Sequence, residues 1–332
     1  MRLLVIGGTQ FVGRHAAAAA LARGHDVTLF NRGRTDPAAF PEAEHLRGDR
    51  ETAEGLAALD GRTWDAALDT CGYVPRVVRA SVERLRNSVD HYTFISTASV
   101  YPDESTVGLD ESAPVAEIED PATENVTAET YGPLKVLCER EVLGAFGERA
   151  LIVRPGYIVG PHDPTDRFTW WPRRVARGGQ MLTPDLGYRM QVVDARDLGD
   201  WWVGLADARV GGVYNAVGPA GPLTLGAVVA AARRASGANV EPVVAATAWL
   251  LANGVTDAEF PLWHPLDEEA GVMAFDTTKA ARAGLRHRSI DEIVRDVLAW
   301  DASRGAHLPA IGMAPERERS LIERWRDASD RR

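Results

Sequence analysis

Short runs of apolar residues alternate along the chain with longer stretches in which apolar positions recur at helical spacing. Buried strands are predicted at Leu3–Ile6, Val27–Phe30, Ala66–Leu68, Tyr92–Ile95 and Leu151–Val153. Helices are predicted between them, over Val12–Arg23, Val77–Leu85 and Leu134–Leu143. Strands that alternate with helices in this way form parallel sheets covered on both faces, so the pattern predicts an α/β fold with a doubly wound parallel sheet.

The pattern changes after residue 160. Residues 160–174, GPHDPTDRFTWWPRR, are irregular and aromatic, and helices are predicted further on at Ala227–Ala235 and Ile290–Trp300. We therefore expect two units, a domain built around the sheet over residues 1–160 and a smaller C-terminal α/β lobe over residues 161–332.

Three further segments modify this picture. Val213–Val217, within residues 190–218, predicts a strand that returns to the sheet of the first domain. Pro102–Thr130 is rich in acidic residues, proline and threonine, and predicts a long surface connection of the kind that often forms a lid. His162, Asp163 and His264 lack the spacing of metal ligands, so we expect structural or loop roles for them and no metal.

The composition is that of a folded protein that acts on small molecules. The chain has 332 residues, a formal net charge of −10 and 45% hydrophobic residues. The negative charge is unfavourable for nucleic-acid binding, and no apolar run approaches the roughly 20 residues that span a membrane. Cys71 and Cys138 form neither a disulfide framework nor a metal motif, which fits a reducing compartment. We therefore expect a cytoplasmic protein with a small-molecule substrate.

A glycine-rich turn lies between the first predicted strand and the first predicted helix. Gly7, Gly8 and Gly13 outline a Rossmann turn, in which main-chain N–H groups and the helix N-terminus hold the pyrophosphate of a dinucleotide. Gln10 stands where the middle glycine is expected, so its side chain either narrows the turn or adds an amide donor. The alternative is an ordinary tight turn. The residues expected to contact the cofactor here are Gly7, Thr9, Gln10, Phe11, Val12 and Gly13.

The end of the second strand bears on the choice between NAD and NADP. A carboxylate at that point binds the adenine ribose of NAD, whereas arginine pairs with the 2′-phosphate of NADP. This chain has Asn31, Arg32 and Arg34 there, so we predict NADP(H), with NAD(H) as the alternative if the arginines are only solvated turn residues. Further cofactor contacts are expected after the third and fourth strands, at Asp49, Thr70 and Gly72. The alternative for Asp49 is an exposed turn residue.

A tyrosine and a lysine four residues apart follow the fifth strand, in the segment ETYGPLK. Positions i and i+4 share one face of a helix, so the Lys135 ammonium can lie beside the Tyr131 phenol and lower its pKa. A tyrosine of this kind exchanges protons near neutral pH. Pro133 is expected in the first turn of the helix, where its missing N–H costs nothing. Taken alone, such a pair is common and not specific.

Together these segments resemble the extended short-chain dehydrogenase/reductases, and in particular their atypical NAD-dependent epimerase/dehydratase-like members. The matching segments, in order, are MRLLVIGGTQFVGRH, NRGR, GD, STASVY, YGPLK and RPGYIVGP. The resemblance implies that Thr97 hydrogen-bonds the substrate oxygen, that Tyr131 is the acid/base, and that Lys135 binds the nicotinamide ribose. It also implies that Pro155 and Gly156 lie against the nicotinamide, and that the helix bearing Tyr131 takes part in a homodimer.

Departures from the family pattern bear on the substrate. Ala98 and Ser99 follow Thr97, where the nucleotide-sugar 4,6-dehydratases of the family carry an Asp-Glu pair, so dehydration is disfavoured. Tyr157 replaces an asparagine that sugar-nucleotide enzymes use near the diphosphate, and Arg189 matches their diphosphate-binding arginine only loosely. The expected substrate contacts are Ser99, Tyr157, Trp170, Trp171 and Arg189.

The two tryptophans of the segment FTWWP have two possible places. Trp170 and Trp171 form a flat apolar wall of the substrate site with nearby arginines as its rim, or they pack the core of the smaller lobe. The arginines that would form the rim are Arg173, Arg174 and Arg177.

Three classes of function fit these residues. The first, which we favour, is an NADP(H)-dependent carbonyl reductase or alcohol dehydrogenase that acts on a small or medium metabolite by hydride transfer. The second is a nucleotide-sugar epimerase that retains NAD and works without added nicotinamide. The third is a non-catalytic dinucleotide-binding protein, since some atypical relatives with a GGTxF opening are RNA-associated or regulatory. The presence of Thr97, Tyr131 and Lys135 argues against the third class.

Overall fold

A seven-stranded parallel sheet forms the centre of the N-terminal domain. A computed structural model describes residues 1–219, 221, 223–307 and 309–330, so part of the predicted lobe at 161–332 lies outside the described residues. The strand order is β11-β6-β5-β4-β1-β2-β3, and all neighbouring pairs are parallel. The strands are β1 (Arg2–Ile6), β2 (Asp26–Asn31), β3 (Glu44–Arg47), β4 (Trp64–Asp69), β5 (Val89–Ile95), β6 (Ala150–Pro155) and β11 (Gly212–Ala216). This is the doubly wound Rossmann order extended by β11, which confirms the predicted α/β fold class.

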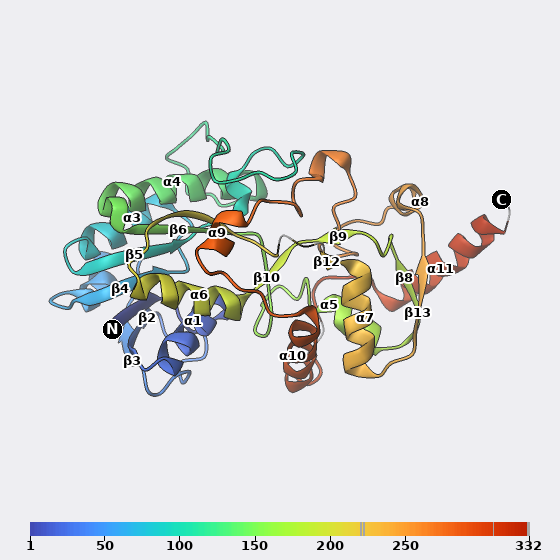
Figure 1. The fold of residues 1–332 in the computed structure, drawn as a ribbon, viewed down its shortest axis with the longest axis horizontal. Helices are drawn as coiled ribbons and strands as arrows, with labels where there is room; N and C mark the ends of the chain where they lie inside the picture. The colour runs from blue at the N-terminus through green and yellow to red at the C-terminus, as the bar shows by residue number, and fades with distance from the viewer. Residues whose placement is uncertain (220, 222, 308, 331–332) are drawn as a thin grey trace.

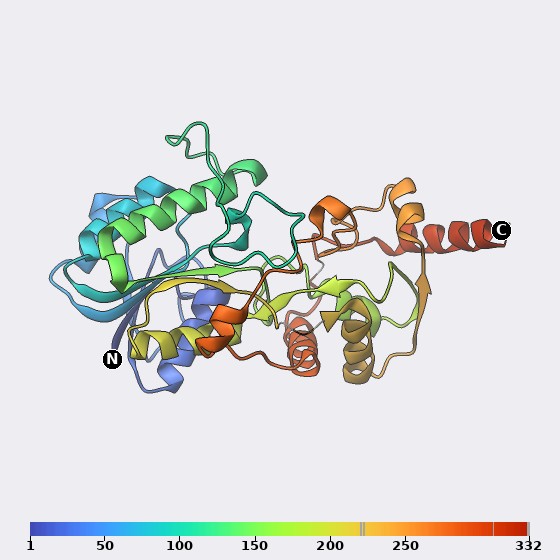
Figure 2. The same cartoon turned by 45° about the horizontal axis from the view of Figure 1, so that its top comes forward.

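Both faces of the sheet are covered by helices, as Figure 2 shows. Leu3 and Val5 of β1 pack on the face that α1 and α6 cover, whereas Leu4 and Ile6 pack on the face of α3 and α4. Because both faces are buried, the strands appear in the sequence as continuous apolar runs and do not alternate with polar residues. The helices of this domain are α1 (Phe11–Ala22), α2 (Ala53–Leu56), α3 (Pro75–Leu85), α4 (Ala128–Phe146) and α6 (Ala195–Asp207).

The second lobe lies beside the carboxyl end of the sheet and carries the C-terminus, at the right of Figure 1. Its strands form two-stranded pairs, β7 (Tyr157–Val159) with β10 (Val192–Asp194), β9 (Arg189–Met190) with β12 (Leu223–Thr224), and β8 (Gly179–Thr183) with β13 (Val240–Val244). The helices of this lobe are α5 (Trp170–Ala176), α7 (Leu225–Ser236), α8 (Thr247–Ala252), α10 (Ile290–Ser303) and α11 (Pro315–Ser329). The short helix α9 (Thr278–Arg282) lies between α8 and α10 in the chain and packs on the first domain.

The chain returns to the first domain after entering the second lobe. Helix α6 packs on α1, β11 pairs with β6, and Ala280 of α9 joins the core around β1. The strand predicted at Val213–Val217 is present one residue earlier, as β11. Among the described residues, no helix combines the length and the apolar character needed to cross a membrane.

Two local predictions are wrong. Helix α4 begins at Ala128, because Thr127 and Thr130 form a capping box in which each hydroxyl accepts a hydrogen bond from the other residue's N–H. Pro133 therefore lies inside the helix and not in its first turn. Trp170–Ala176 forms α5 within a stretch expected to be irregular, since its two tryptophans bury their rings in the core of the lobe. The connection predicted at Pro102–Thr130 contains no helix or strand as far as Thr127, and its last three residues belong to α4.

Candidate active site

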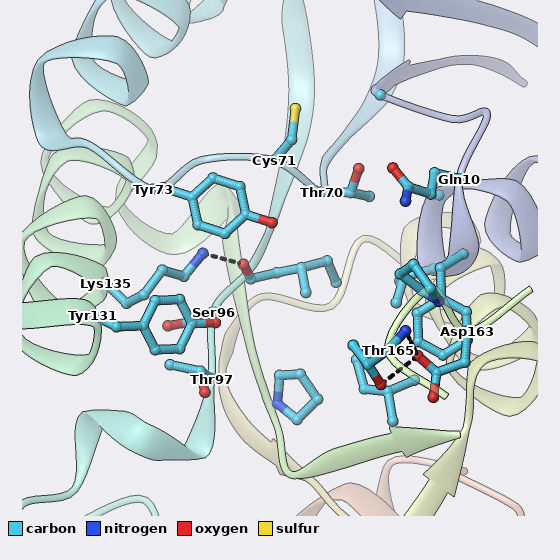
Figure 3. Close-up of a pocket in the computed structure, with 18 of the residues that line it drawn as sticks. Gln10, Thr70, Cys71, Tyr73, Ser96, Thr97, Tyr131, Lys135, Asp163 and Thr165 are labelled. Atoms are coloured by element: carbon cyan, nitrogen blue, oxygen red, sulfur yellow. Dashed lines mark hydrogen bonds between the residues drawn. The ribbon is translucent and has the colours of Figure 1, made fainter. Parts of the chain in front are cut away.

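A cavity of about 930 Å³ runs from the turn after β1 to the residues that follow β5 and β6 (Figure 3). It lies at the carboxyl ends of the strands, where the strand order reverses between β1 and β4. Ligands of open parallel α/β sheets bind at this switch point. Its far end is lined by the second lobe, through Arg167, His264 and Glu269.

The turn after β1 has the main-chain geometry of an anion-binding loop. Gly7 and Gly8 have φ angles of +108° and +85°, a region that favours glycine. A side chain at Gly13 would meet the main-chain nitrogen of Gly8 at 2.7 Å, so glycine is needed for α1 to pack this closely on the turn. Thr9, Phe11 and Val12 also line the cavity. This turn fits the pyrophosphate of a dinucleotide.

Gln10 is compatible with this turn. It occupies the N-cap position of α1 with φ −133° and ψ 139°, an extended conformation open to any residue. Its side chain makes no cap hydrogen bond, and it is exposed at the cavity wall (Figure 3). The glutamine therefore leaves both the turn and the helix intact and places an amide at the cavity.

The residues after β2 are basic and lie at the same end of the cavity. Arg32 and Arg34 are exposed and line it, and the Arg32 guanidinium is 4.0 Å from the Asp49 carboxylate. Asn31 also lines the cavity and braces the turn, because its amide donates to the Gly7 carbonyl at 2.9 Å and its oxygen accepts from the Gly33 N–H at 2.8 Å. The first acidic residue after β2 in the chain, Asp36, pairs with Arg14 at 2.6 Å.

Thr70 and Gly72, which follow β4, have different roles. The Thr70 hydroxyl lines the cavity and donates to the Ile6 carbonyl at 2.9 Å. Gly72 is not among the residues that line the cavity, so its contact with the cofactor stays a prediction. A side chain at Gly72 would meet Phe94 and Val78 at 2.6 Å each, so glycine is needed here for packing on the core.

Thr97, Tyr131 and Lys135 meet at one wall of the cavity, together with Tyr73 (Figure 3). Thr97 follows β5 and caps the short 3₁₀ helix Ala98–Val100, where its hydroxyl accepts the Ser99 N–H and donates to the Ser99 hydroxyl, both at 3.1 Å. Ser99, Pro155 and Gly156 also line the cavity. The end of β5 and the first two turns of α4 thus bring Thr97, Tyr131 and Lys135 to a single site.

The Lys135 ammonium is buried beside the site. It donates to the main-chain carbonyls of Gly72 and Ile95, at 2.7 Å each, and lies 4.0 Å from the centre of the Phe94 ring. Burial lowers the pKa of Lys135 to about 8. An ammonium group has three donors, so one remains for a group in the cavity that Lys135 lines.

The expected lowering of the Tyr131 pKa by Lys135 is wrong. Burial raises the pKa of Tyr131, while the hydrogen bond with Thr97 and the charge of Arg167 act in the opposite direction without reversing it. The Lys135 ammonium is held instead by the main-chain carbonyls of Gly72 and Ile95.

Three of the residues expected to bind substrate lie elsewhere. Trp170 and Trp171 are 5% and 1% exposed in the core of the second lobe, and the Trp171 indole donates to the Pro261 carbonyl at 2.6 Å. Arg189 is exposed on β9 and does not line the cavity. The arginines beside the tryptophans are not a substrate rim either, since Arg174 pairs with the buried Glu318 at 2.7 Å. The alternative that the tryptophans pack the core is correct.

Tyr157 lies in the cavity and leads to residues that sequence reasoning missed. Its hydroxyl forms a 2.7 Å hydrogen bond with Nε2 of His264, and Nδ1 of His264 lies 3.5 Å from the Glu269 carboxylate. The Arg167 guanidinium lies 5.1 Å from the centre of the Tyr157 ring. His264 lies in a loop, as expected, and this loop brings it to the cavity wall. Its partner Tyr157 is 107 residues away, so no local spacing could indicate the pair.

The other two residues for which loop roles were predicted differ from each other. Asp163 lines the cavity and is 2% exposed, and it accepts hydrogen bonds from the Thr165 N–H and hydroxyl at 2.8 and 2.7 Å. Burial raises the pKa of Asp163. The His162 ring lies against Trp300, with ring centres 5.6 Å apart. No group of three or more potential metal ligands is found within the part of the chain that the structure describes.

The sheet order and the glycine turn define the class of protein, a dinucleotide-binding Rossmann protein with its cavity at the switch point of the sheet. Within that class, the chain belongs to the NAD dependent epimerase/dehydratase family, whose profile matches residues 3–216.

Curated relatives match part of the chain. Chloroplast stem-loop binding protein of 41 kDa b, from Arabidopsis thaliana, is 26% identical over 212 residues, which are 59% of this chain and 53% of that protein. A 3-beta-hydroxysteroid dehydrogenase from Mycolicibacterium neoaurum is 31% identical over 188 residues, 49% of each chain. The chain spans about half the length of the curated relatives it matches.

Solved structures match nearly the whole chain in fold. The Bordetella bronchiseptica enzyme WbmH in complex with NAD⁺ has a TM-score of 0.70 and 15% identity, covering 92% of this chain and 99% of its own. The UDP-Glc/GlcNAc 4-epimerase from Campylobacter jejuni has a TM-score of 0.68 and 16% identity, covering 91% and 99%. Both likenesses show the shared fold.

Proposed function

We propose that this protein is an NADP(H)-dependent oxidoreductase, a carbonyl reductase or alcohol dehydrogenase that acts on a small or medium metabolite. The observation that carries the proposal is that Thr97, Tyr131 and Lys135 line the same cavity as the glycine turn after β1. The hydroxysteroid dehydrogenase relative, which is named for a redox reaction at an alcohol, supports the same class of chemistry.

The roles of the three residues follow from their surroundings. NADPH held by the glycine turn after β1 would supply the hydride for the carbonyl carbon. Tyr131 donates its phenolic proton to the carbonyl oxygen, and its raised pKa keeps that proton available at neutral pH. Thr97 orients the same oxygen through its hydroxyl, and Lys135 offers its remaining donor to a cofactor hydroxyl. In the reverse direction the alcohol gives its proton back to Tyr131.

The preference for NADP(H) rests on charge at one end of the cavity. Arg32 and Arg34 line it after β2, where an NAD-specific site carries a carboxylate. A guanidinium pairs with a 2′-phosphate through charge-assisted hydrogen bonds. NAD(H) is the alternative cofactor.

A second candidate is a nucleotide-sugar epimerase with retained NAD. It is favoured by the fold shared with the Campylobacter jejuni epimerase. Against it, Arg189 lies outside the cavity, and Tyr157 replaces the asparagine of sugar-nucleotide enzymes. An epimerase of this kind would be recognised by NAD that stays bound through purification and by activity without added nicotinamide cofactor.

A third candidate is a dinucleotide-binding protein without catalysis. The relative named for stem-loop binding favours it, and the negative net charge disfavours it. For the favoured enzyme we propose a small-molecule substrate. We also propose that two copies of the chain form a homodimer in which α4 is part of the interface.

The test of the proposed function is the Tyr131→Phe variant, assayed with a panel of carbonyl compounds by NADPH absorbance. Removal of the proton donor is expected to lower turnover by a factor of about 10²–10⁴ while the Kd for NADPH stays unchanged within about twofold. Tyr214→Phe is the matched control, because Tyr214 lies on β11 outside the cavity wall. Wild-type turnover in Tyr131→Phe would show that the proposed mechanism is wrong.

A further inference from the structure

Arg167 presents a guanidinium at the substrate end of the cavity. Its Nε donates to the Thr165 hydroxyl at 3.3 Å, and that hydroxyl donates to the Asp163 carboxylate at 2.7 Å. One face of the guanidinium is turned to the Tyr157 ring. Among the described residues, no hydrogen-bond or ion-pair partner is found for the two terminal nitrogens. The hydrogen bond from Nε thus fixes the guanidinium, and its two terminal nitrogens remain for a ligand.

The supports of Arg167 are themselves held in place. The Tyr157 hydroxyl is bound by His264, which is backed by Glu269. The loop carrying Arg167 is anchored by Asp166, which pairs with Arg304 at 2.7 and 3.2 Å and with His307 at 2.7 Å. Asp166 holds a φ of +56°, a conformation that is costly for a residue other than glycine. The guanidinium is therefore positioned before any ligand arrives, which reduces the entropy lost on binding.

Arg167 is the cation that a ligand can reach at this end of the cavity. Glu269 faces His264, Asp163 accepts from Thr165, and the third carboxylate of this end, Glu104, acts on Tyr157. Within the described part of the chain, no carboxylate lies within 4.0 Å of the Arg167 guanidinium. A guanidinium without a carboxylate partner in a half-enclosed site favours an anionic ligand, because the charge of the ligand replaces lost hydration.

We propose that Arg167 binds an anionic group of the substrate through its two terminal nitrogens. The substrate class is then a carbonyl compound, or the corresponding alcohol, that carries a carboxylate or a phosphate. The planar guanidinium matches either oxyanion with two parallel hydrogen bonds. The reaction at the carbonyl rests on the proposed function, whereas the binding of the anion does not.

The test measures binding without turnover, by calorimetry on the protein with NADP⁺. Three pairs of probes differ in charge: levulinate and methyl levulinate, dihydroxyacetone phosphate and dihydroxyacetone, and UDP and uridine. At least one anion is expected to bind about tenfold more tightly than its neutral partner. Arg167→Gln is expected to abolish that preference, and Arg167→Lys to keep part of it, because a lysine retains the charge but not the paired donors.

Arg189→Gln is the matched control, since Arg189 is exposed and outside the cavity, and it is expected to keep the full preference. An unchanged NADPH Kd and circular dichroism spectrum show that Arg167→Gln is folded. The pair that shows the preference identifies a carboxylate, a phosphate monoester or a nucleoside diphosphate as the anion. The proposal is overturned if no anion binds at millimolar concentration, if neutral partners bind equally well, or if Arg167→Gln keeps the preference.

These outcomes are separate from those of the proposed function. If no carbonyl compound is reduced but the Arg167-dependent preference is present, the site binds anions and the redox assignment fails. If reduction depends on Tyr131 but no preference is seen, the redox assignment holds and the anion site fails.

Discussion

Lys135 and Tyr131 lie one helical turn apart on α4, yet burial affects their titrations in opposite directions. Burial favours the neutral form of each group, so it lowers the pKa of Lys135 to about 8 and raises the pKa of Tyr131. Reduction of a carbonyl needs both groups protonated. Tyr131 meets this condition throughout the neutral range, so under the proposed function we expect Lys135 to be the group that limits activity at alkaline pH.

This gives a prediction for the pH profile of kcat/KM. We expect the rate of reduction to be level below about pH 8 and to fall as the pH rises through the pKa of Lys135. In Lys135→Arg the charge persists to higher pH, so the falling limb is expected to move beyond about pH 10, whatever the absolute rate. The profile is measured between pH 6 and 10. An unchanged limb in Lys135→Arg would assign it to another group.

Arg32 gives a prediction for the cofactor. Its guanidinium is more than half exposed at the cavity, and its contact with the Asp49 carboxylate is long, at 4.0 Å, so it is available to a phosphate. We expect Arg32→Ala to raise the Kd for NADPH about tenfold and to leave the Kd for NADH within twofold. Fluorescence titration checks this, with Arg62→Ala as the control because Arg62 pairs with Glu44 away from the cavity. Tighter binding of NADH than of NADPH by the wild type contradicts the preference.

At the scale of elements, α4 is fixed to the sheet by a buried ion pair. The Glu139 carboxylate of α4 accepts two hydrogen bonds from Arg154 of β6, at 3.0 and 2.6 Å. Arg154 also donates to the Tyr101 hydroxyl at 3.0 Å, and this hydroxyl donates to Asn215 of β11 at 2.7 Å. This network ties the helix that carries Tyr131 and Lys135 to β6, β11 and the segment after β5.

The network gives a prediction for stability. Glu139→Gln leaves a buried arginine without its counter-charge, so we expect the free energy of unfolding to fall by about 3 kcal/mol. Glu141→Gln removes the partner of Arg79 on the exposed side of the same helix, and we expect a change below about 1 kcal/mol. Urea unfolding measures both variants. Equal effects of the two substitutions would mean that the buried pair does not hold α4.

At the scale of the whole molecule, residues near the C-terminal end of the second lobe hold the loop that forms one wall of the cavity. Arg304 and His307 hold Asp166, next to Arg167, across more than a hundred residues of sequence. The first domain therefore supplies the glycine turn and the proposed acid/base residues, and the second lobe lines the end of the cavity where we propose that substrate binds.

This division gives a prediction for Asp166→Asn. Loss of the charged anchor frees the loop, so we expect the preference for the anionic probe to fall several-fold, because the guanidinium is less well positioned. The Kd for NADPH is expected to stay unchanged, since Asp166 does not line the cavity. Calorimetry with the same probe pairs measures the first quantity, and fluorescence titration the second. A parallel loss of NADPH affinity would show that the effect spreads beyond the loop.

The sequence by itself determined the features that depend on neighbouring residues. Apolar runs placed the strands, and glycines placed the turn after β1, because burial on both faces and positive φ angles restrict residue type locally. The spacing of Tyr131 and Lys135 placed both on one helix face. Only the tertiary structure decided what depends on distant segments. Burial raises the pKa of Tyr131 and puts Trp171 in the core, and packing of the second lobe brings His264 to Tyr157 across 107 residues, beside Arg167. These contacts depend on residues far apart in the chain, and no local pattern records them.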